Sequence, residues 1–235
     1  MNGAPHVQTQ DLANKAYFDQ WAKSYDNGRI SKWFQYTQKL ALSFVPLRKD
    51  SKVLDVGCGT GFAVHQLASI LEDGMACGID VSPRMVQEAT AKAPKMLSGR
   101  VEFREASSAN IPYPADEFDF VLCTNSFHHY PDPLRALREM RRVLRPGGQF
   151  VILENAPDLS WYTWAWDHLL RFIEKGHICY YYSHDLEDML NKSGFRPVRL
   201  CYLGNNFLKH GKLFASLQIW SGQKPDKILG TGSEN

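Results

Sequence analysis

The feature that most constrains this chain is the run Val-Leu-Asp-Val-Gly-Cys-Gly-Thr-Gly at residues 53–61. Its apolar half suits a buried strand, and Gly57, Gly59 and Gly61 then follow at every second position. Glycine has no Cβ, so the backbone can turn sharply there and a ligand can lie against it. Apolar residues recur at helical spacing over 62–71. The segment therefore predicts a strand, a glycine-rich turn and a helix, an arrangement with which α/β proteins hold nucleotide-like ligands.

Two related loops fit this segment poorly. A phosphate-binding loop ends in Gly-Lys-Ser/Thr, whereas Gly61 is followed by Phe62 and Ala63. A dinucleotide fingerprint has its third glycine three positions after the second, and that position is again Phe62. Asp55, two residues before the first glycine, would repel a pyrophosphate but suits an ammonium group or a loop amide.

A second acid, Asp80, ends the next apolar strand, which is predicted over 75–80. A carboxylate at this place can accept hydrogen bonds from both hydroxyls of a ribose. Asp80 could instead cap the following helix. However, Ser82 and Pro83 already supply a cap and a first position for a helix over 84–91. This leaves the Asp80 carboxylate for a ligand.

Residues 53–61, 78–85 and 118–154 resemble the class I S-adenosylmethionine-dependent methyltransferases, above all the small-molecule branch with the ubiquinone and menaquinone biosynthesis methyltransferases. The resemblance is strongest over 50–155. It implies an α/β, Rossmann-like fold with a seven-stranded, mostly parallel sheet, an antiparallel last strand and helices on both faces. It also implies S-adenosyl-L-methionine as cofactor, S-adenosyl-L-homocysteine as product, and in-line methyl transfer to a small-molecule acceptor.

Hydrophobic periodicity and turn residues predict the same alternation of elements. Helices are expected over 12–25, 30–45, 62–71, 84–91, 133–144, 161–175 and 184–193, and strands over 52–56, 75–80, 101–105, 118–124, 149–154, 197–202 and 213–220. We expect a helical cap over the cofactor site at 1–48, with 1–10 frayed, a methyltransferase domain at 49–222 with an aromatic insertion at 157–184, and a disordered tail at 223–235.

Composition limits the partners. The 235 residues are 44% hydrophobic, enough for one core, and the net charge of +2 gives no strong field toward nucleic acid or acidic membranes. Arginines recur over 135–145, but the same helix has an apolar face, so solvation explains them better than RNA binding. The most apolar stretch, 161–173, is too short to span a bilayer. We expect a monomer or homodimer without nucleic-acid partners or stable membrane insertion.

The five cysteines are odd in number and scattered, as in a cytoplasmic protein with reduced, buried thiols. No Cys-x-x-Cys or paired-histidine spacing predicts a metal site. The amino terminus has no charged-then-apolar signal segment, which also favours a cytoplasmic location.

The resemblance and the motifs give a set of candidate cofactor-binding residues. In relatives, an acid after the third strand accepts from the adenine amine, whereas this chain has Ala106, Ser107 and Ser108 there. A serine hydroxyl can accept the same bond without charge assistance. The full set is Tyr25, Asp55, Gly57, Cys58, Gly59, Gly61, Asp80, Val81, Met85, Ser107, Ser108 and Asn125.

Paired histidines, His128 and His129, follow the fourth predicted strand, in a loop that the fold sets beside the glycine turn. A histidine has a pKa near neutral and could remove a proton from an acceptor hydroxyl. The alternative is that either ring only packs in the loop and hydrogen-bonds to the backbone.

Aromatic residues gather in the amino-terminal helices and in the insertion, which favours an apolar or aromatic acceptor. Some of them must instead cover the sheet. The candidates for the acceptor site are Tyr17, Trp21, Trp161, Trp164, His177 and Tyr181.

Two other functions stay open at this stage. One is a regulatory module that binds the cofactor without transferring the methyl group, which the serine at position 107 mildly favours. The other is a nicotinamide-dependent oxidoreductase, which Phe62 disfavours.

Overall fold

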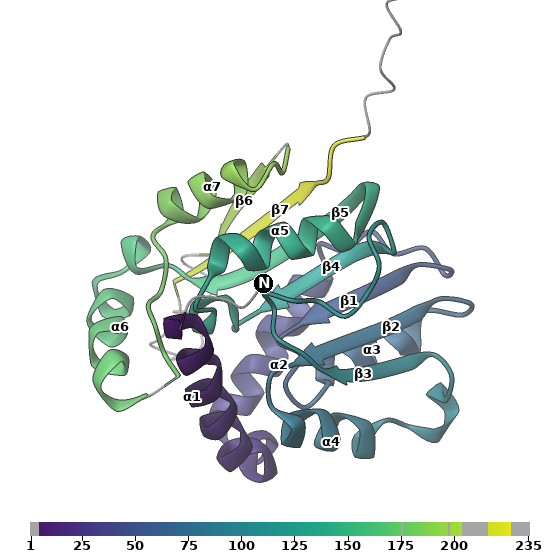
Figure 1. Cartoon of the computed structure of the whole chain (residues 1–235), viewed down its shortest axis with the longest axis horizontal. Helices are drawn as coiled ribbons and strands as arrows, with labels where there is room; N and C mark the ends of the chain where they lie inside the picture. Colours follow the sequence, from purple (N-terminus) through teal and green to yellow (C-terminus); the bar gives the residue numbers. More distant parts are fainter. Residues whose placement is uncertain (1–4, 175, 197, 204–215, 227–235) are drawn as a thin grey trace, which may run out of the picture.

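The computed structural model describes residues 5–174, 176–196, 198–203 and 216–226, which form one mixed sheet between two layers of helices (Figure 1). The sheet has seven strands in the order β3-β2-β1-β4-β5-β7-β6, and β7 alone runs opposite to the direction of the other six. The strands are β1 Lys52–Val56, β2 Met75–Asp80, β3 Val101–Glu105, β4 Phe118–Thr124, β5 Leu144–Asn155, β6 Val198–Leu203 and β7 Leu217–Gln223. The α/β class, the mostly parallel sheet, the antiparallel last strand and the helices on both faces are confirmed.

Seven α-helices lie along the described chain: α1 Pro5–Trp21, α2 Arg29–Leu42, α3 Phe62–Ile70, α4 Pro83–Lys92, α5 Pro133–Val143, α6 Trp161–Ile173 and α7 Ser183–Lys192. In Figure 1, α5 crosses in front of the sheet and α2 and α3 lie behind it. Within the described residues, none of these helices is long and apolar enough to cross a membrane.

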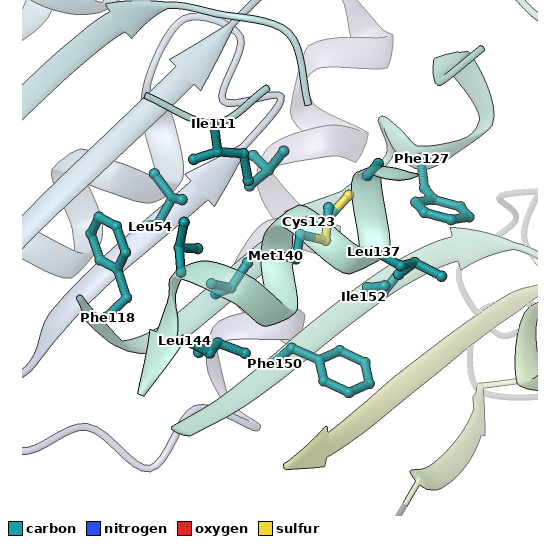
Figure 2. Close-up of a cluster of buried hydrophobic side chains, with 14 of the residues drawn as sticks. Leu54, Ile111, Phe118, Cys123, Phe127, Leu137, Met140, Leu144, Phe150 and Ile152 are labelled. Carbon is teal, nitrogen blue, oxygen red and sulfur yellow. The ribbon is translucent and has the colours of Figure 1, made fainter. Parts of the chain in front are cut away.

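The core consists of one apolar cluster on each face of the sheet. In β1, Leu54 and Val56 belong to the cluster under α5 and α7, and Val53 belongs to the cluster under α2 and α3. Side chains alternate between the faces of a strand, so a strand buried on both faces is apolar at successive positions. Figure 2 shows Leu137 and Met140 of α5 over this first cluster. The glycine turn therefore follows a central strand that is held by apolar packing on both faces.

The strand order reverses between β1 and β4. The chain goes from β1 outward to β2 and β3, then returns to pair β4 on the other side of β1. Crevices at such a switch point, beyond the carboxyl ends of the strands, are where open α/β sheets bind ligands. The turn after β1 and the loop after β4 both end at this point.

The amino-terminal helix differs from the prediction. It begins at Pro5, so residues 5–10 are helical and not frayed, and it ends at Trp21, after which 22–27 form a 3-10 helix, η1 (Ala22–Asn27). Proline suits the first turn of a helix, because that turn has no internal partner for its N–H groups. Tyr25 therefore lies in η1 and not in a continuous α-helix.

The fifth strand also differs from the prediction, since it begins at Leu144 and not at residue 149. The segment Arg145-Pro146-Gly147-Gly148 does not lie outside the strand. It makes a register shift between the pairs Phe118–Leu144 and Phe120–Gln149, as a bulge does.

The end of the sheet lies further along the chain than predicted. β7 runs to Gln223, and the Lys224 ammonium group bonds to Asp116 Oδ1 and the Leu144 carbonyl. Residues 223–226 are thus part of the fold, and the rest of the predicted tail, 227–235, lies outside the described residues, as do 213–215.

Candidate functional site

The turn after β1 adopts a conformation that requires glycine. The φ angles of Gly57, Gly59 and Gly61 are +76°, +51° and +81°, in the left-handed region. A Cβ on Gly57 would also lie 2.5 Å from Ser126 Oγ, in the loop after β4. The bare backbone therefore lets the two loops of the switch point come together, in addition to the sharp turn that the glycine spacing predicted.

Asp80 lies at the tip of β2 and is buried. Its Oδ2 accepts a hydrogen bond from the Gly59 N–H at 2.9 Å, and its Oδ1 accepts one from the Ser82 N–H at 2.9 Å. Ser82 caps α4 through its own hydroxyl, which accepts from the Met85 N–H at 3.1 Å, as predicted. Burial raises the pKa of Asp80 to about 6. Each carboxylate oxygen can accept more than one bond, so Asp80 both shapes the turn and retains acceptor capacity for a ligand.

Several buried acceptor oxygens near the turn have no partner among the described residues. They are both oxygens of Asp55, Oδ1 of Asn125 and Oε1 of Gln38. Burial, and then the nearby Asp80, raise the pKa of Asp55 to about 8. Buried polar atoms without partners are costly. The amide oxygens of Asn125 and Gln38, two residues that line the cleft, only accept, so they suit a ligand that brings N–H donors or positive charge.

An open cleft lies above the turn. Ten of the predicted site residues line it: Tyr25, Gly57, Gly59, Asp80, Val81, Met85, Ser107, Ser108, Asn125 and His129. Asp55, Cys58, Gly61 and His128 are not in the lining; Cys58 faces the buried core. The lining residues that the sequence analysis did not single out for the site are Asp11, Asn14, Phe18, Gln38, Ile79, Ala106, Thr124, Ser126 and Tyr130.

The amino-terminal helices form one wall of the cleft. A Cβ on Gly59 would lie 3.8 Å from the ring of Tyr25, so the ring stands over the turn. Tyr25 itself is packed against Phe34 and Trp21, with ring centroids 5.6 and 4.8 Å apart. Trp21 and Tyr17, both predicted for the acceptor site, do not line the cleft, and Trp21 acts behind Tyr25.

His128 lies in the 3-10 turn η3 (Phe127–His129) and is buried beside β5. Its Nδ1 is 2.7 Å from Glu154 Oε2, and Glu154 Oε1 accepts from the Phe127 N–H at 2.7 Å. Burial raises the pKa of Glu154 to about 7 and holds that of His128 well below its usual value. Glu154 thereby fixes the loop that carries both histidines.

His129 occupies the cleft wall in a defined tautomer. Its Nδ1 is 2.7 Å from the Gly176 carbonyl. A carbonyl only accepts, so Nδ1 carries the proton and Nε2 keeps a free lone pair in the neutral ring. Burial lowers the pKa of His129 well below its usual value, and Glu174 Oε1 lies 3.8 Å from Nε2. The ring is therefore neutral, with a carboxyl group near its unprotonated nitrogen.

The predicted acceptor residues of the insertion lie outside the cleft lining. Trp161 and Trp164 are on the surface of α6, with Trp161 68% exposed. His177 is buried and its Nε2 bonds to Asp167 Oδ1 at 2.8 Å, while Tyr181 packs against the cluster under α5. Within the described residues, no group of three or more His, Cys, Asp or Glu side chains is placed to hold a metal ion.

Comparison with known proteins places these features in a family. A family described as "Methyltransferase domain" matches residues 47–185. The 27-O-demethylrifamycin SV methyltransferase of Amycolatopsis mediterranei is 38% identical over 167 residues, which cover 68% of this chain and 59% of that protein. The demethylmenaquinone methyltransferase of Listeria welshimeri is 30% identical over 176 residues, covering 71% and 73%. The chain thus spans less than two-thirds of the length of the rifamycin enzyme.

Solved structures share the fold. A chain from the complex between the Haloferax volcanii Trm112 methyltransferase activator and a methyltransferase superposes with a TM-score of 0.76. The superposition covers 91% of this chain and 98% of that chain at 21% identity, so the likeness concerns the fold alone.

Proposed function

Because the chain belongs to the methyltransferase-domain family, we propose that it transfers the methyl group of S-adenosyl-L-methionine to a small apolar or aromatic acceptor, with S-adenosyl-L-homocysteine as product. One observation carries the proposal. A cleft lies above the turn at Gly57 and Gly59, at the point where the strand order reverses, and Asp80 lines the same cleft. When bound, this cofactor supplies an electrophilic methyl group on a sulfonium ion.

The residues present fit this cofactor. The partnerless oxygens of Gln38 and Asn125 in the cleft wall suit the ammonium group of its amino-acid half, and Asp80 suits the two ribose hydroxyls. Val81 and Met85 offer apolar surface beyond Asp80 for the base. Burial raises the pKa of Asp55, just beneath the turn, and a cation bound nearby would favour the ionised form of this carboxyl group.

The chain's main task is then to align the acceptor with the methyl group and to exclude water. Phe18, Tyr25 and Tyr130 stand around the cleft and supply rigid apolar walls. Alignment of two reactants can supply about 7–11 kcal/mol of a barrier. Phe18 is in edge-on contact with His129, with ring centroids 5.0 Å apart, so an acceptor that packed against this pair would meet an aromatic ring and the candidate base together.

His129 is our candidate base for an acceptor hydroxyl. Its Nε2 would accept the proton, and the carboxyl group of Glu174 would stabilise the imidazolium formed. His128 has no place in the cleft wall, and its bond to Glu154 assigns it to positioning the loop. The names of the two sequence relatives, both small-molecule methyltransferases, support an acceptor of this class.

Isothermal calorimetry and isotope transfer test the proposal. We expect S-adenosyl-L-homocysteine to bind and NAD not to bind, and we expect labelled methyl groups to pass from S-adenosyl-L-methionine to members of a panel of phenols and quinols. Binding of NAD alone would favour an oxidoreductase. Binding of the cofactor with no label in any acceptor class would favour a regulatory module.

The two histidines make a matched pair for the mechanism. With a hydroxyl acceptor, His129→Gln should lower kcat by about 100-fold or more, because general-base catalysis contributes about that much. Affinity for S-adenosyl-L-homocysteine should stay within about twofold. His128→Gln should act mainly on thermal stability, because it loosens the bond to Glu154. Equal kcat in the His129 variant and the wild type would remove His129 from the mechanism.

A further inference from the structure

The loop after β3 lines the cleft beyond Asp80 without an acid of its own. Ala106, Ser107 and Ser108 form this part of the wall, opposite the apolar surface of Val81 and Met85. If the proposed function is correct, the base of the nucleoside lies here, because Asp80 faces its sugar. Two serine hydroxyls alone give weak selection among bases, since a hydroxyl both donates and accepts.

A carboxylate reaches this place from a distant part of the chain. Asp11 of α1 lines the same cleft, and its Oδ2 accepts a hydrogen bond from Ser107 Oγ at 3.0 Å. Asp11 is half-buried, and burial raises its pKa above the usual value although the Ser107 bond opposes the shift. The described residues offer Asp11 no cation and no second hydrogen bond. The remaining acceptor sites of the Asp11 carboxylate are therefore available to a ligand in the cleft.

The helix is held in a fixed register at this position. Lys15 Nζ lies 2.5 Å from Glu105 Oε1, and Asp19 Oδ1 accepts from Ser82 Oγ at 2.6 Å and from the Arg84 N–H at 3.2 Å. Residues 11, 15 and 19 are four apart and so lie on one face of the helix. On this face, Lys15 contacts the end of β3 and Asp19 contacts the start of α4. Asp11 is thus positioned by two anchors on its own helix.

We propose that Asp11 determines the choice of nucleobase by accepting a hydrogen bond from the exocyclic amine of adenine. This goes beyond the proposed function and rests on it. The 6-amino group of adenine can donate to a carboxylate. The 6-oxo group of hypoxanthine only accepts, so its oxygen would repel the carboxylate oxygen. A site built around one hydrogen bond rejects an analogue that lacks it more strongly than an apolar pocket rejects a change of size. The acid acts from α1, so base selection and the docking of α1 are coupled.

The experiment compares S-adenosyl-L-homocysteine with S-inosyl-L-homocysteine, which differs by the 6-oxo group, by calorimetry at pH 7.5. The wild type should prefer the adenine compound by at least about 30-fold. Asp11→Asn keeps the shape but offers an amide that can also donate to an oxo group, so the preference should fall by about tenfold or more. Ser107→Ala leaves the Asp11 carboxylate in place, and the preference should largely remain.

Asp19→Asn is the matched control, since it changes another carboxylate on the same helix face, at an anchor of the helix. It should weaken both compounds by a similar factor and leave their ratio within about twofold. The assignment would be overturned if Asp11→Asn left the affinity ratio of the two compounds unchanged, or if Asp19→Asn lowered that ratio by the same factor as Asp11→Asn. A wild type that binds neither compound would instead overturn the proposed function, and the inference would fall with it.

Discussion

The turn after β1 and the cover made by α1 line the same cleft but are built in different ways. The turn is fixed by main-chain geometry: three left-handed glycines, with the Gly57 and Cys58 N–H groups both 2.9 Å from the Ile79 carbonyl. The cover is held by side chains, such as Asn14, whose Nδ2 donates to the His129 carbonyl at 2.7 Å. The cofactor side is therefore shaped by the backbone, whereas the position of the cover depends on the side chains that dock it.

The largest expected effect concerns the cofactor side. Gly57→Ala puts a Cβ 2.5 Å from Ser126 Oγ and in a left-handed backbone, so affinity for S-adenosyl-L-homocysteine should fall by about 100-fold or more. Gly99→Ala is the matched control, because Gly99 has the same sign of φ but open space around it. It should cost about 1–2 kcal/mol of stability and leave the affinity unchanged. Calorimetry that gave equal affinities for the two variants would contradict a packed turn.

Asp80→Asn should have the next largest effect. The amide keeps the shape and one acceptor but loses the charge and the second acceptor, so affinity for S-adenosyl-L-homocysteine should fall by about 10- to 30-fold. Thermal unfolding should show whether the variant remains folded, because Asp80 also accepts from Gly59 and Ser82. A folded variant with wild-type affinity would show that Asp80 serves only the turn.

The third prediction concerns pH. An acid with a higher pKa in the folded protein than in the unfolded chain binds protons more tightly when folded, so stability is lost as the pH rises past the unfolded value. For Asp55 this loss runs from about pH 4 to about pH 8. Asp55→Asn should therefore be more stable than the wild type by about 1–3 kcal/mol at pH 8.5, with little difference at pH 4.

Urea unfolding at the two pH values measures this difference. Asp73→Asn, which removes an exposed carboxylate, is the control and should change little at either pH. The stabilised Asp55 variant should also bind the cationic cofactor less tightly, because a buried acid that weakens the fold is typical of a binding site. Equal stability of Asp55→Asn and the wild type at pH 8.5 would argue against a strained carboxyl group.

The smallest expected effect is on the outer surface of α6, which does not line the cleft. Phe172 on α6 is 88% exposed, so Phe172→Ser should change the free energy of unfolding by less than about 0.5 kcal/mol. Leu170 lies two positions earlier and is buried, so Leu170→Ala should lower the free energy of unfolding by about 2–3 kcal/mol. A large loss from the Phe172 variant would mean that the outer face of α6 is packed in solution.

The difference between the two sides also explains what the sequence could predict. The glycine turn and the Ser82 cap follow from residue types at a few successive positions, and Asp80 from its place at the end of an apolar strand, so these local patterns were informative. Asp11 and Asn14 reach Ser107 and His129, about a hundred positions away, through the docking of a whole helix. No local pattern encodes that contact. For the same reason the aromatic residues of α6 suggested an acceptor wall, although most of them face outward.

The order of the strands in the sheet also determines when each strand can pair during synthesis. β6 leaves the ribosome before β7, yet it pairs with β7 alone, and β7 must enter between β5 and β6. The five strands from β3 to β5 can therefore assemble while β6 waits without a neighbour. Lys224, which bonds to the bulge of β5 from just beyond β7, is synthesised after all seven strands. Native strand pairing is completed only after translation has passed residue 223.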